Sequence, residues 1–185
     1  MRQRFDFDDR LQARTALLAV SRSTLRNQGA PGVVAAARKY LRSINLSKFS
    51  VHTRAEFEAV LEKHTRLLMR RFPKKVKENW GAARKALNIF LRDVVYLRPL
   101  SARYRLSQLT PWLELPLDRN AYDGLVEDSR RGDDIPSWPG IKALDPKVSA
   151  ELQTFADTMA KRLSTCRVHL DVRYWRKASI DDLEG

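Results

Sequence analysis

Apolar residues recur along most of this sequence at intervals of three and four, the spacing that places them on one face of a helix. In the first expected helix the apolar positions are Leu11, Leu17, Leu18 and Leu25. The helices that the pattern predicts cover residues 9–27, 32–44, 54–72, 80–93, 101–104, 119–127 and 146–163.

Residues typical of helix ends support several of these boundaries. Thr53 begins a capping-box pattern with Glu56. Asp145–Pro146 combines a favoured N-cap with a favoured first helical residue. Gly29 is suited to end the first helix, and Pro31 is suited to the first turn of the second.

The last part of the chain decides the fold class. Residues 129–140, with two prolines and two glycines, predict a loop. In residues 166–175 apolar and polar side chains alternate as in a strand, but nothing else in the sequence offers a partner strand. We therefore expect a terminal helix and an all-α fold.

The length and composition indicate a single domain. Hydrophobic residues make up 43% of 185, which is enough for a substantial core. We expect a compact helical bundle of two small lobes. One lobe is formed by residues 1–50 with 145–185, and the other by residues 51–144.

Cysteine usage and hydropathy indicate a cytoplasmic protein. Cys166 is the single cysteine, so neither a disulfide nor a four-thiolate iron–sulfur cluster can form within the chain. The first ten residues lack the apolar core of a signal peptide, and no apolar run is long enough to span a membrane.

The net charge of +13 is concentrated in one segment. Residues 61–105 contain thirteen lysines or arginines and only three acids, and so hold +10 of that total. A solvated helix face normally mixes both signs, so this excess favours a polyanion partner. Double-stranded DNA is the expected partner, ahead of an anionic membrane surface.

Lys85 occupies a distinctive position in the expected helix 80–93. At about 100° per residue, the core face of this helix comprises Ala83, Ala86, Leu87, Phe90, Leu91 and Val94. Lys85, Asn88 and Arg92 fall on the opposite face. We expect Lys85 to point away from the core near the helix start, where backbone N–H groups favour an anion.

Two stretches resemble a known family. "GAARKALNIFL", residues 81–91, is similar to the second half of the helix-hairpin-helix in DNA glycosylases of the endonuclease III superfamily, which reads close to G-V-G-R-K-T-A-N. "LPLDRNA", residues 115–121, is similar to the V-D-T-H-V stretch of that family. Ala83 replaces the second hairpin glycine, and Arg119–Asn120 replaces Thr-His.

The resemblance implies a DNA N-glycosylase, with or without lyase activity. It carries the catalytic lysine onto Lys85 and the catalytic aspartate onto Asp118, facing one pocket, and makes Gly81 a backbone contact to a DNA phosphate. Such an enzyme flips a base out of the duplex and cleaves its bond to the sugar. A carboxylate stabilises the positive charge that develops on the sugar. A lysine amine can attack the sugar carbon, and the resulting Schiff base leads to strand cleavage.

These considerations give two sets of candidate residues. The DNA contacts are expected to be Lys74, Lys75, Lys77, Gly81, Arg84, Asn88 and Arg92. The candidates for the wall of a base pocket are Trp80, Trp112, Trp138 and His169. His169 and Asp171 are too few ligands for a metal site, and no metal or cofactor is expected.

Each central residue also has a simpler interpretation. Asp118 can be an ordinary N-cap for the helix that begins at Arg119. Lys85 can be a plain phosphate contact, and the tryptophans can be core residues. His169 and Asp171 are more readily a structural pair than part of a site.

Three functions remain open at this stage: a DNA glycosylase, a non-catalytic helical DNA- or RNA-binding module, and a basic adaptor in a larger assembly. For the glycosylase, the excised base can be an oxidised purine, an alkylated base or a hypermodified base of phage DNA. The last would make the protein part of antiviral defence rather than repair. We expect a monomer without an obligate protein partner.

Overall fold

The computed structural model describes residues 6–21, 23–25, 31–76 and 78–175, and these residues form a helical fold without strands. The α-helices are α1 Phe7–Ala19, α2 Val33–Leu41, α3 Arg54–Met69, α4 Trp80–Tyr96, α5 Arg98–Tyr104, α6 Arg119–Asp128, α7 Pro146–Arg162 and α8 Leu170–Tyr174. Short 3-10 helices cover Leu46–Phe49 (η1), Lys74–Val76 (η2), Ser107–Leu109 (η3) and Arg167–His169 (η4). The all-α prediction is confirmed.

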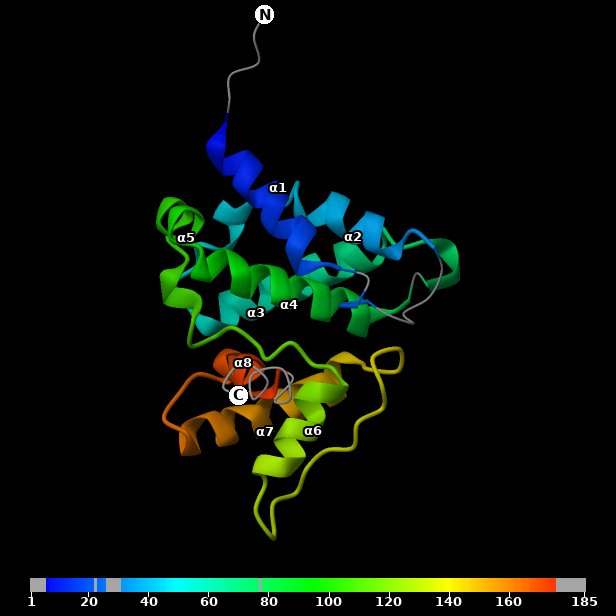
Figure 1. Cartoon of the computed structure of the whole chain (residues 1–185), viewed down its shortest axis with the longest axis vertical. Helices are drawn as coiled ribbons and strands as arrows, with labels where there is room; N and C mark the ends of the chain where they lie inside the picture. Colours follow the sequence, from blue (N-terminus) through cyan, green and yellow to red (C-terminus); the bar gives the residue numbers. More distant parts are fainter. Residues whose placement is uncertain (1–5, 22, 26–30, 77, 176–185) are drawn as a thin grey trace, which may run out of the picture.

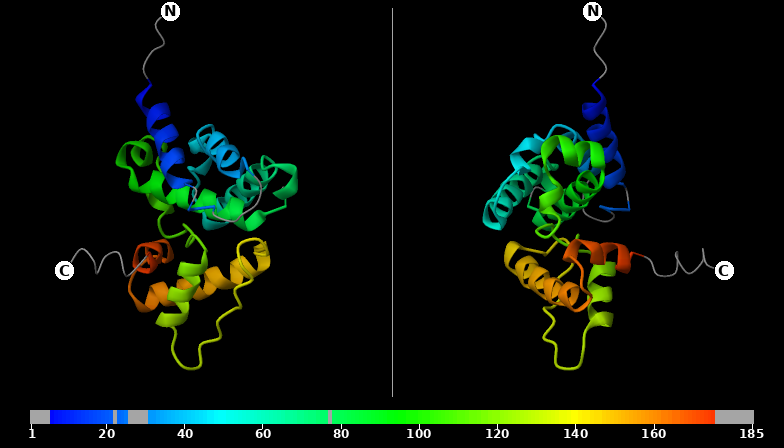
Figure 2. Two further views of the ribbon diagram at one scale, coloured as in Figure 1. Left: turned by 45° about the vertical axis from the view of Figure 1, so that its right-hand side comes forward. Right: turned by 90° about the vertical axis from the view of Figure 1, so that its left-hand side faces the viewer.

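The helices form two lobes, one above the other in Figure 1. The N-terminal lobe holds α1–α5, and the C-terminal lobe holds α6–α8; the views in Figure 2 show the same division. Buried apolar residues form two matching clusters, one from Ala16 to Leu113 together with Val168, the other from Leu115 to Tyr174 together with Trp80. In the described part of residues 1–50, α1 packs on α4, α2 packs on α3 and α4, and η1 packs on α3, whereas the expected division grouped residues 1–50 with residues 145–185.

Helix α4 lies where the two lobes meet (Figure 1). It packs against α1, α2, α3 and α5 of its own lobe. Thirteen of its seventeen residues are buried, including Arg84, Lys85 and Asn88. Lys85 points away from the core of the N-terminal lobe, as expected, but the C-terminal lobe covers this face of the helix and buries the side chain.

Capping residues fix three helix starts, as the sequence indicates. The Thr53 side chain accepts a hydrogen bond from Glu56 N, and the Glu56 carboxylate accepts from Thr53 N in return. Asp145 caps α7 by accepting from Val148 N at 2.8 Å, with Pro146 as the first helical residue. Asp118 caps α6 in the same way.

The first two helices differ from the prediction. α1 ends at Ala19, and it buries Gln12, Thr15, Ala16 and Ala19 while Leu17 and Leu18 are exposed. The Gln12 amide donates to the carbonyl oxygens of Leu41 and Ile44, which ties this polar face to the end of α2. Pro31 lies before α2 rather than in its first turn, because Gly32 with φ 99° is the N-cap. The expected terminator Gly29 lies outside the described residues.

α4 runs three residues beyond the expected end, and α5 begins at Arg98 rather than at residue 101. Residues 129–140 form the long loop, and residues 167–174 are helical rather than extended. None of the helices in the described part of the chain combines the length and apolar character needed to cross a bilayer.

Candidate active site

Lys85 and Asp118 form an ion pair between the two lobes. Lys85 Nζ lies 2.9 Å from Asp118 Oδ2, and the exposed fractions of the two side chains are 8% and 29%. Lys85 lies in the second turn of α4, and Asp118 lies at the N-terminus of α6. The sequence separates these residues widely, and the fold brings them into direct contact.

The backbone before α6 aims the Asp118 carboxylate. Asp118 is extended, with φ −150° and ψ −171°, and follows Pro116 and Leu117, both buried. Its Oδ1 accepts from Ala121 N at 2.9 Å, while Oδ2 contacts Lys85. One oxygen therefore fixes the helix start, and the other faces α4.

A buried carboxylate, Glu114, lies behind this pair. Arg84 donates to it through Nε at 2.8 Å and Nη2 at 2.9 Å, and Asn88 Nδ2 donates at 2.9 Å. Burial by itself raises the pKa of Glu114. The guanidinium of Arg84, with help from Arg167 and Asn88, outweighs burial and holds that pKa below its usual value.

The segment of residues 112–115, which connects the two lobes, is held by hydrogen bonds from Gln153 and Arg167. Gln153 of α7 accepts from Leu115 N at 3.0 Å and donates to Leu115 O at 2.8 Å. Arg167 donates to Leu113 O at 3.0 Å and to Trp112 O at 2.9 Å. These bonds, together with those of Glu114, fix the segment that presents Asp118.

The crevice beside the pair is narrow. It is lined by Gly81, Arg84, Lys85, Asn88, Leu117, Leu144, Ser149 and Gln153. In this conformation it does not admit a water-sized sphere, and so it has no room for a nucleobase. The Lys85 side chain is accordingly only 8% exposed.

The aromatic candidates for a base pocket lie apart. Trp80 donates to the Glu62 carboxylate, with Arg84 5.1 Å from the centre of its ring. Trp112 packs near Phe57, at 6.4 Å between ring centres. Trp138 stacks on Tyr122 at 5.9 Å.

His169, the fourth candidate, has a structural environment. Its Nδ1 lies 2.9 Å from Thr165 Oγ1, and its ring lies 6.0 Å from that of Tyr96. Neither His169 nor the three tryptophans are among the residues that line the crevice.

The expected DNA contacts divide into exposed and buried residues. Lys74 and Lys75 are exposed on η2, and Lys77 lies outside the described residues. Gly81 is buried against the loop before α7, where an added Cβ would meet Ile141 and Leu144. Arg84 and Asn88 are bound to Glu114, and Arg92 pairs with Asp93 and Asp171.

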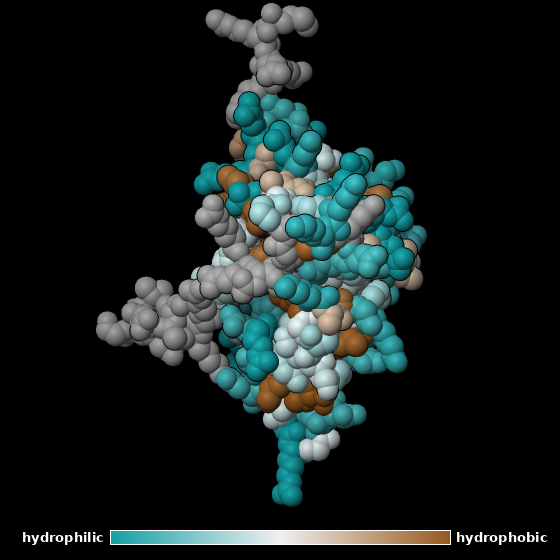
Figure 3. Space-filling model, turned by 90° about the vertical axis from the view of Figure 1, so that its right-hand side faces the viewer, coloured by the Kyte–Doolittle hydropathy of each residue, from teal (hydrophilic) through white to brown (hydrophobic). Residues whose placement is uncertain are grey.

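One group of exposed basic residues lies along the second half of α3, the turn after it and η2. We call this the α3–η2 basic surface; its described members are Lys63, Arg66, Arg70, Arg71, Lys74 and Lys75. Of these, Arg66 pairs with Glu62 at 2.6 Å. Hydrophilic side chains predominate over the N-terminal lobe on the face in Figure 3.

Sequence reasoning missed Glu114, Gln153 and Arg167. The available signal for Glu114 was a carboxylate between leucines in "LELPL", since an acid in an apolar run is rarely buried without a cationic partner. Gln153 and Arg167 carried no local signal, because their partners are backbone carbonyl and amide groups far along the chain.

Comparison of the chain with protein families, curated proteins and solved structures finds no match.

Proposed function

We propose that the protein is a DNA N-glycosylase in which Asp118 and Lys85 act on the sugar of a flipped-out nucleotide. The observation that carries the proposal is the 2.9 Å pair between α4 and the start of α6. A buried lysine in contact with a partly buried carboxylate provides the groups that base excision with Schiff-base formation uses. The similarity of residues 81–91 and 115–121 to the endonuclease III superfamily supports the same assignment.

Asp118 is positioned for the charge that develops when the base leaves. As the C1′–N bond breaks, the bonding electrons leave with the base, and the sugar becomes positively charged. A fixed carboxylate in a water-poor crevice stabilises that charge more strongly than water does. The hydrogen bond from Ala121 N keeps Asp118 from turning away.

Lys85 supplies the nucleophile. Its amine must lose a proton before it can attack C1′, and the Asp118 carboxylate is within reach to accept that proton. Attack forms a C–N bond to the sugar, and the resulting Schiff base permits strand cleavage. Without that attack, water takes the place of the amine and the enzyme only releases the base.

DNA enters this site only when the lobes separate. The α3–η2 basic surface attracts the phosphate backbone. Insertion of the target nucleotide then replaces the contacts between α4 and the C-terminal lobe around Leu117 and Leu144. Such closing and opening around a substrate is common in enzymes.

A second candidate function is DNA binding without chemistry. It is favoured by the closed crevice and by the engagement of both Asp118 oxygens, which together suit an ion pair that fastens the lobes. In that case the α3–η2 basic surface accounts for the whole function.

The two candidates are separated by assaying base release. The protein is incubated with duplexes that each carry one oxidised purine, alkylated base or hypermodified pyrimidine, and free bases are measured by mass spectrometry. The glycosylase proposal predicts release from at least one duplex. Where release occurs, borohydride should trap a protein–DNA adduct that Lys85→Gln abolishes.

Two results would reassign the function or the residue. Tight, salt-sensitive duplex binding with no base released from any duplex supports the binding module. Base release with no trapped adduct restricts Lys85 to a non-covalent role.

A further inference from the structure

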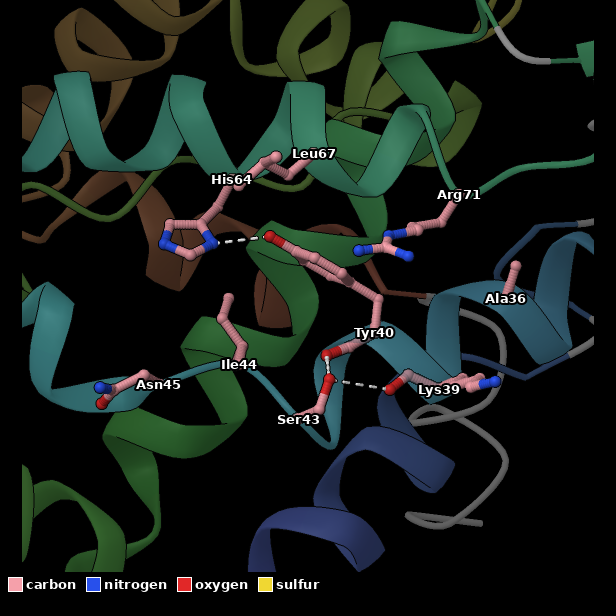
Figure 4. Close-up of a pocket in the computed structure, with 9 residues that line it drawn as sticks. All are labelled: Ala36, Lys39, Tyr40, Ser43, Ile44, Asn45, His64, Leu67 and Arg71. Carbon is pink, nitrogen blue, oxygen red and sulfur yellow. Dashed lines mark hydrogen bonds between the residues drawn. The ribbon is translucent and has the colours of Figure 1, made fainter.

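A second cavity lies in the N-terminal lobe, away from the Lys85–Asp118 pair. It is an open cleft of about 530 Å³ between α2, the turn that follows it, and α3. Its walls come from Ala36, Lys39, Tyr40, Ser43, Ile44, Asn45, His64, Leu67 and Arg71 (Figure 4). A volume of this size suits a small organic ligand.

One end of the cleft is cationic. Arg71 and Lys39 lie at this end, with the Arg71 guanidinium beside the Tyr40 ring (Figure 4). Both side chains belong to exposed residues, and among the described residues neither forms an ion pair with a carboxylate. A lysine of α2 and an arginine of the turn after α3, at one end of a cavity, are suited to a phosphate group.

The other end offers neutral hydrogen-bonding groups. Tyr40 Oη lies 2.7 Å from His64 Nδ1. Burial lowers the pKa of His64, with Lys63 adding to the effect, so the imidazole is neutral at pH 7. Burial raises the pKa of Tyr40 to about 12 despite Arg71, so its hydroxyl keeps its proton and can donate to Nδ1.

This arrangement leaves two donors at the same end of the cleft. With Tyr40 donating to Nδ1, the His64 ring carries its proton on Nε2, at the end of the cleft where Asn45 lies (Figure 4). Asn45 Oδ1 accepts from Ser47, which leaves its NH₂ group available. Between the two ends, Ile44 and Leu67 contribute apolar surface.

We propose that this cleft binds a nucleotide, with the phosphate on Arg71 and Lys39 and the base over Ile44 and Leu67, its edge toward His64 and Asn45. The nucleotide is either a free mononucleotide or the terminal unit of a DNA strand, since both present the same groups. The site is separate from Lys85 and Asp118, and the proposal does not rest on base excision.

Binding is tested by equilibrium dialysis of the full chain at low salt with the four deoxynucleoside 5′-monophosphates, a deoxynucleoside and inorganic phosphate. At least one monophosphate should bind, and the deoxynucleoside and inorganic phosphate should each bind at least about tenfold more weakly, because each keeps only one end of the interaction. Equal binding of inorganic phosphate and monophosphates, or no binding of any monophosphate, would overturn the proposal.

A neighbouring arginine provides the matched control. Arg71→Gln removes the phosphate contact and should weaken nucleotide binding at least about tenfold, the effect of a lost charge-assisted hydrogen bond. Arg70→Gln makes the same charge change at an exposed position that does not line the cleft, and it should leave binding nearly unchanged. Equal losses in the two variants would indicate general charge attraction and contradict the assignment.

Two further experiments distinguish a strand end from a free nucleotide as the ligand, and the cleft from the Lys85–Asp118 site. Displacement of the mononucleotide by a 5′-phosphorylated single strand, but not by its 5′-hydroxyl form, identifies a strand end; lack of displacement by either identifies a free nucleotide, and both results support the site. Lys85→Gln should retain nucleotide binding, so failure of the excision proposal leaves this one standing. Loss of nucleotide binding in Lys85→Gln would contradict the separation of the two sites.

Discussion

Glu114 is flanked by leucines and yet ionised, because its partners satisfy both oxygens. Arg84 binds it in bidentate fashion, and Asn88 adds a third bond. A buried ion pair of this kind fixes the positions of its residues more than it adds to the free energy of unfolding. Removing one partner is nevertheless destabilising, because the other charge is then buried without a counter-ion. The hydrogen bonds of Glu114 to Arg84 and Asn88 therefore fix the backbone position of the segment that ends at Asp118.

The first prediction concerns this carboxylate. Glu114→Gln should lower the free energy of unfolding by about 3–5 kcal/mol at neutral pH, because it leaves Arg84 without its counter-ion. Urea denaturation measures the change. Glu58→Gln, which breaks an exposed pair with Arg54, is the control and should change stability by less than about 1 kcal/mol.

The pH dependence has the same origin. The pKa of Glu114 is lower in the folded protein than its ordinary value of 4.5, so the folded state holds the proton less tightly than the unfolded state does. The contribution of Glu114 is therefore complete above pH 4.5 and is lost as the pH falls toward the folded pKa. The acid sensitivity of the Glu114→Gln variant should be smaller than that of the wild type.

At the scale of elements, α4 is buried on two faces. This burial determines how a substitution at Gly81 changes the stability of the protein. A helix-interior Gly→Ala change normally stabilises by about 1 kcal/mol. At Gly81 the added Cβ would lie well inside contact distance of the Ile141 carbonyl oxygen and 2.9 Å from Leu144 Cβ. Gly81 allows the loop before α7 to pack directly on the backbone of α4.

Gly81→Ala should therefore destabilise the protein by about 1–3 kcal/mol, as over-packing of a tight contact does. Thermal unfolding followed by circular dichroism measures the shift. A stability equal to or above that of the wild type would mean that the loop at Ile141 moves away at little cost.

The elements themselves were largely predictable from sequence. Thr53, Asp118 and Asp145 have local capping chemistry, so their helices begin where the sequence places them. α1 was harder, because its buried positions include Gln12 and Thr15, whose hydrogen bonds depend on tertiary structure or on its own backbone. The second buried face of α4 was not predictable, since a helical wheel cannot show which lobe will cover Lys85 and Asn88.

The candidate site followed from a resemblance rather than from the residues alone. Nothing in the spacing of Lys85 and Asp118 requires contact, and the pair became a hypothesis because each lies in a stretch similar to a glycosylase motif. The Arg84–Glu114–Asn88 network and the closed crevice required the three-dimensional structure.

At the scale of the molecule, part of the charge of residues 61–105 is buried between the lobes and part is exposed. Arg84, Lys85 and Arg92 are paired with acids between or beside the lobes, whereas Lys74 and Lys75 remain on the α3–η2 basic surface. Only the exposed part is available to a polyanion. The same basic segment therefore supplies cations that join the lobes and cations that the proposed DNA partner could reach.

Replacing Lys74 and Lys75 with Ala should weaken duplex binding and reduce its salt dependence. Each lost phosphate contact lowers the slope of log K against log salt by about 0.9. Fluorescence anisotropy over a range of salt concentrations measures both effects. Replacing Lys142 and Lys147, exposed lysines beside and in α7, is the matched control and should leave the slope nearly unchanged.

The central claim is that the Asp118 carboxylate acts on the sugar during base excision. Asn caps a helix about as well as Asp, so Asp118→Asn keeps the start of α6. It leaves the buried Lys85 ammonium without its counter-ion, and a loss of about 1–3 kcal/mol in unfolding free energy is expected. Circular dichroism and duplex binding must show that the variant is folded under the assay conditions.

The decisive measurement is the single-turnover rate of base release by Asp118→Asn on a duplex that the wild type excises. Asp123→Asn, which alters an exposed carboxylate on α6 paired with Arg119, is the control. We predict that Asp118→Asn binds the duplex at least as tightly as the wild type but releases the base about a hundred- to a thousandfold more slowly, while Asp123→Asn retains the full rate. A folded Asp118→Asn variant that releases the base at the wild-type rate would contradict the assignment.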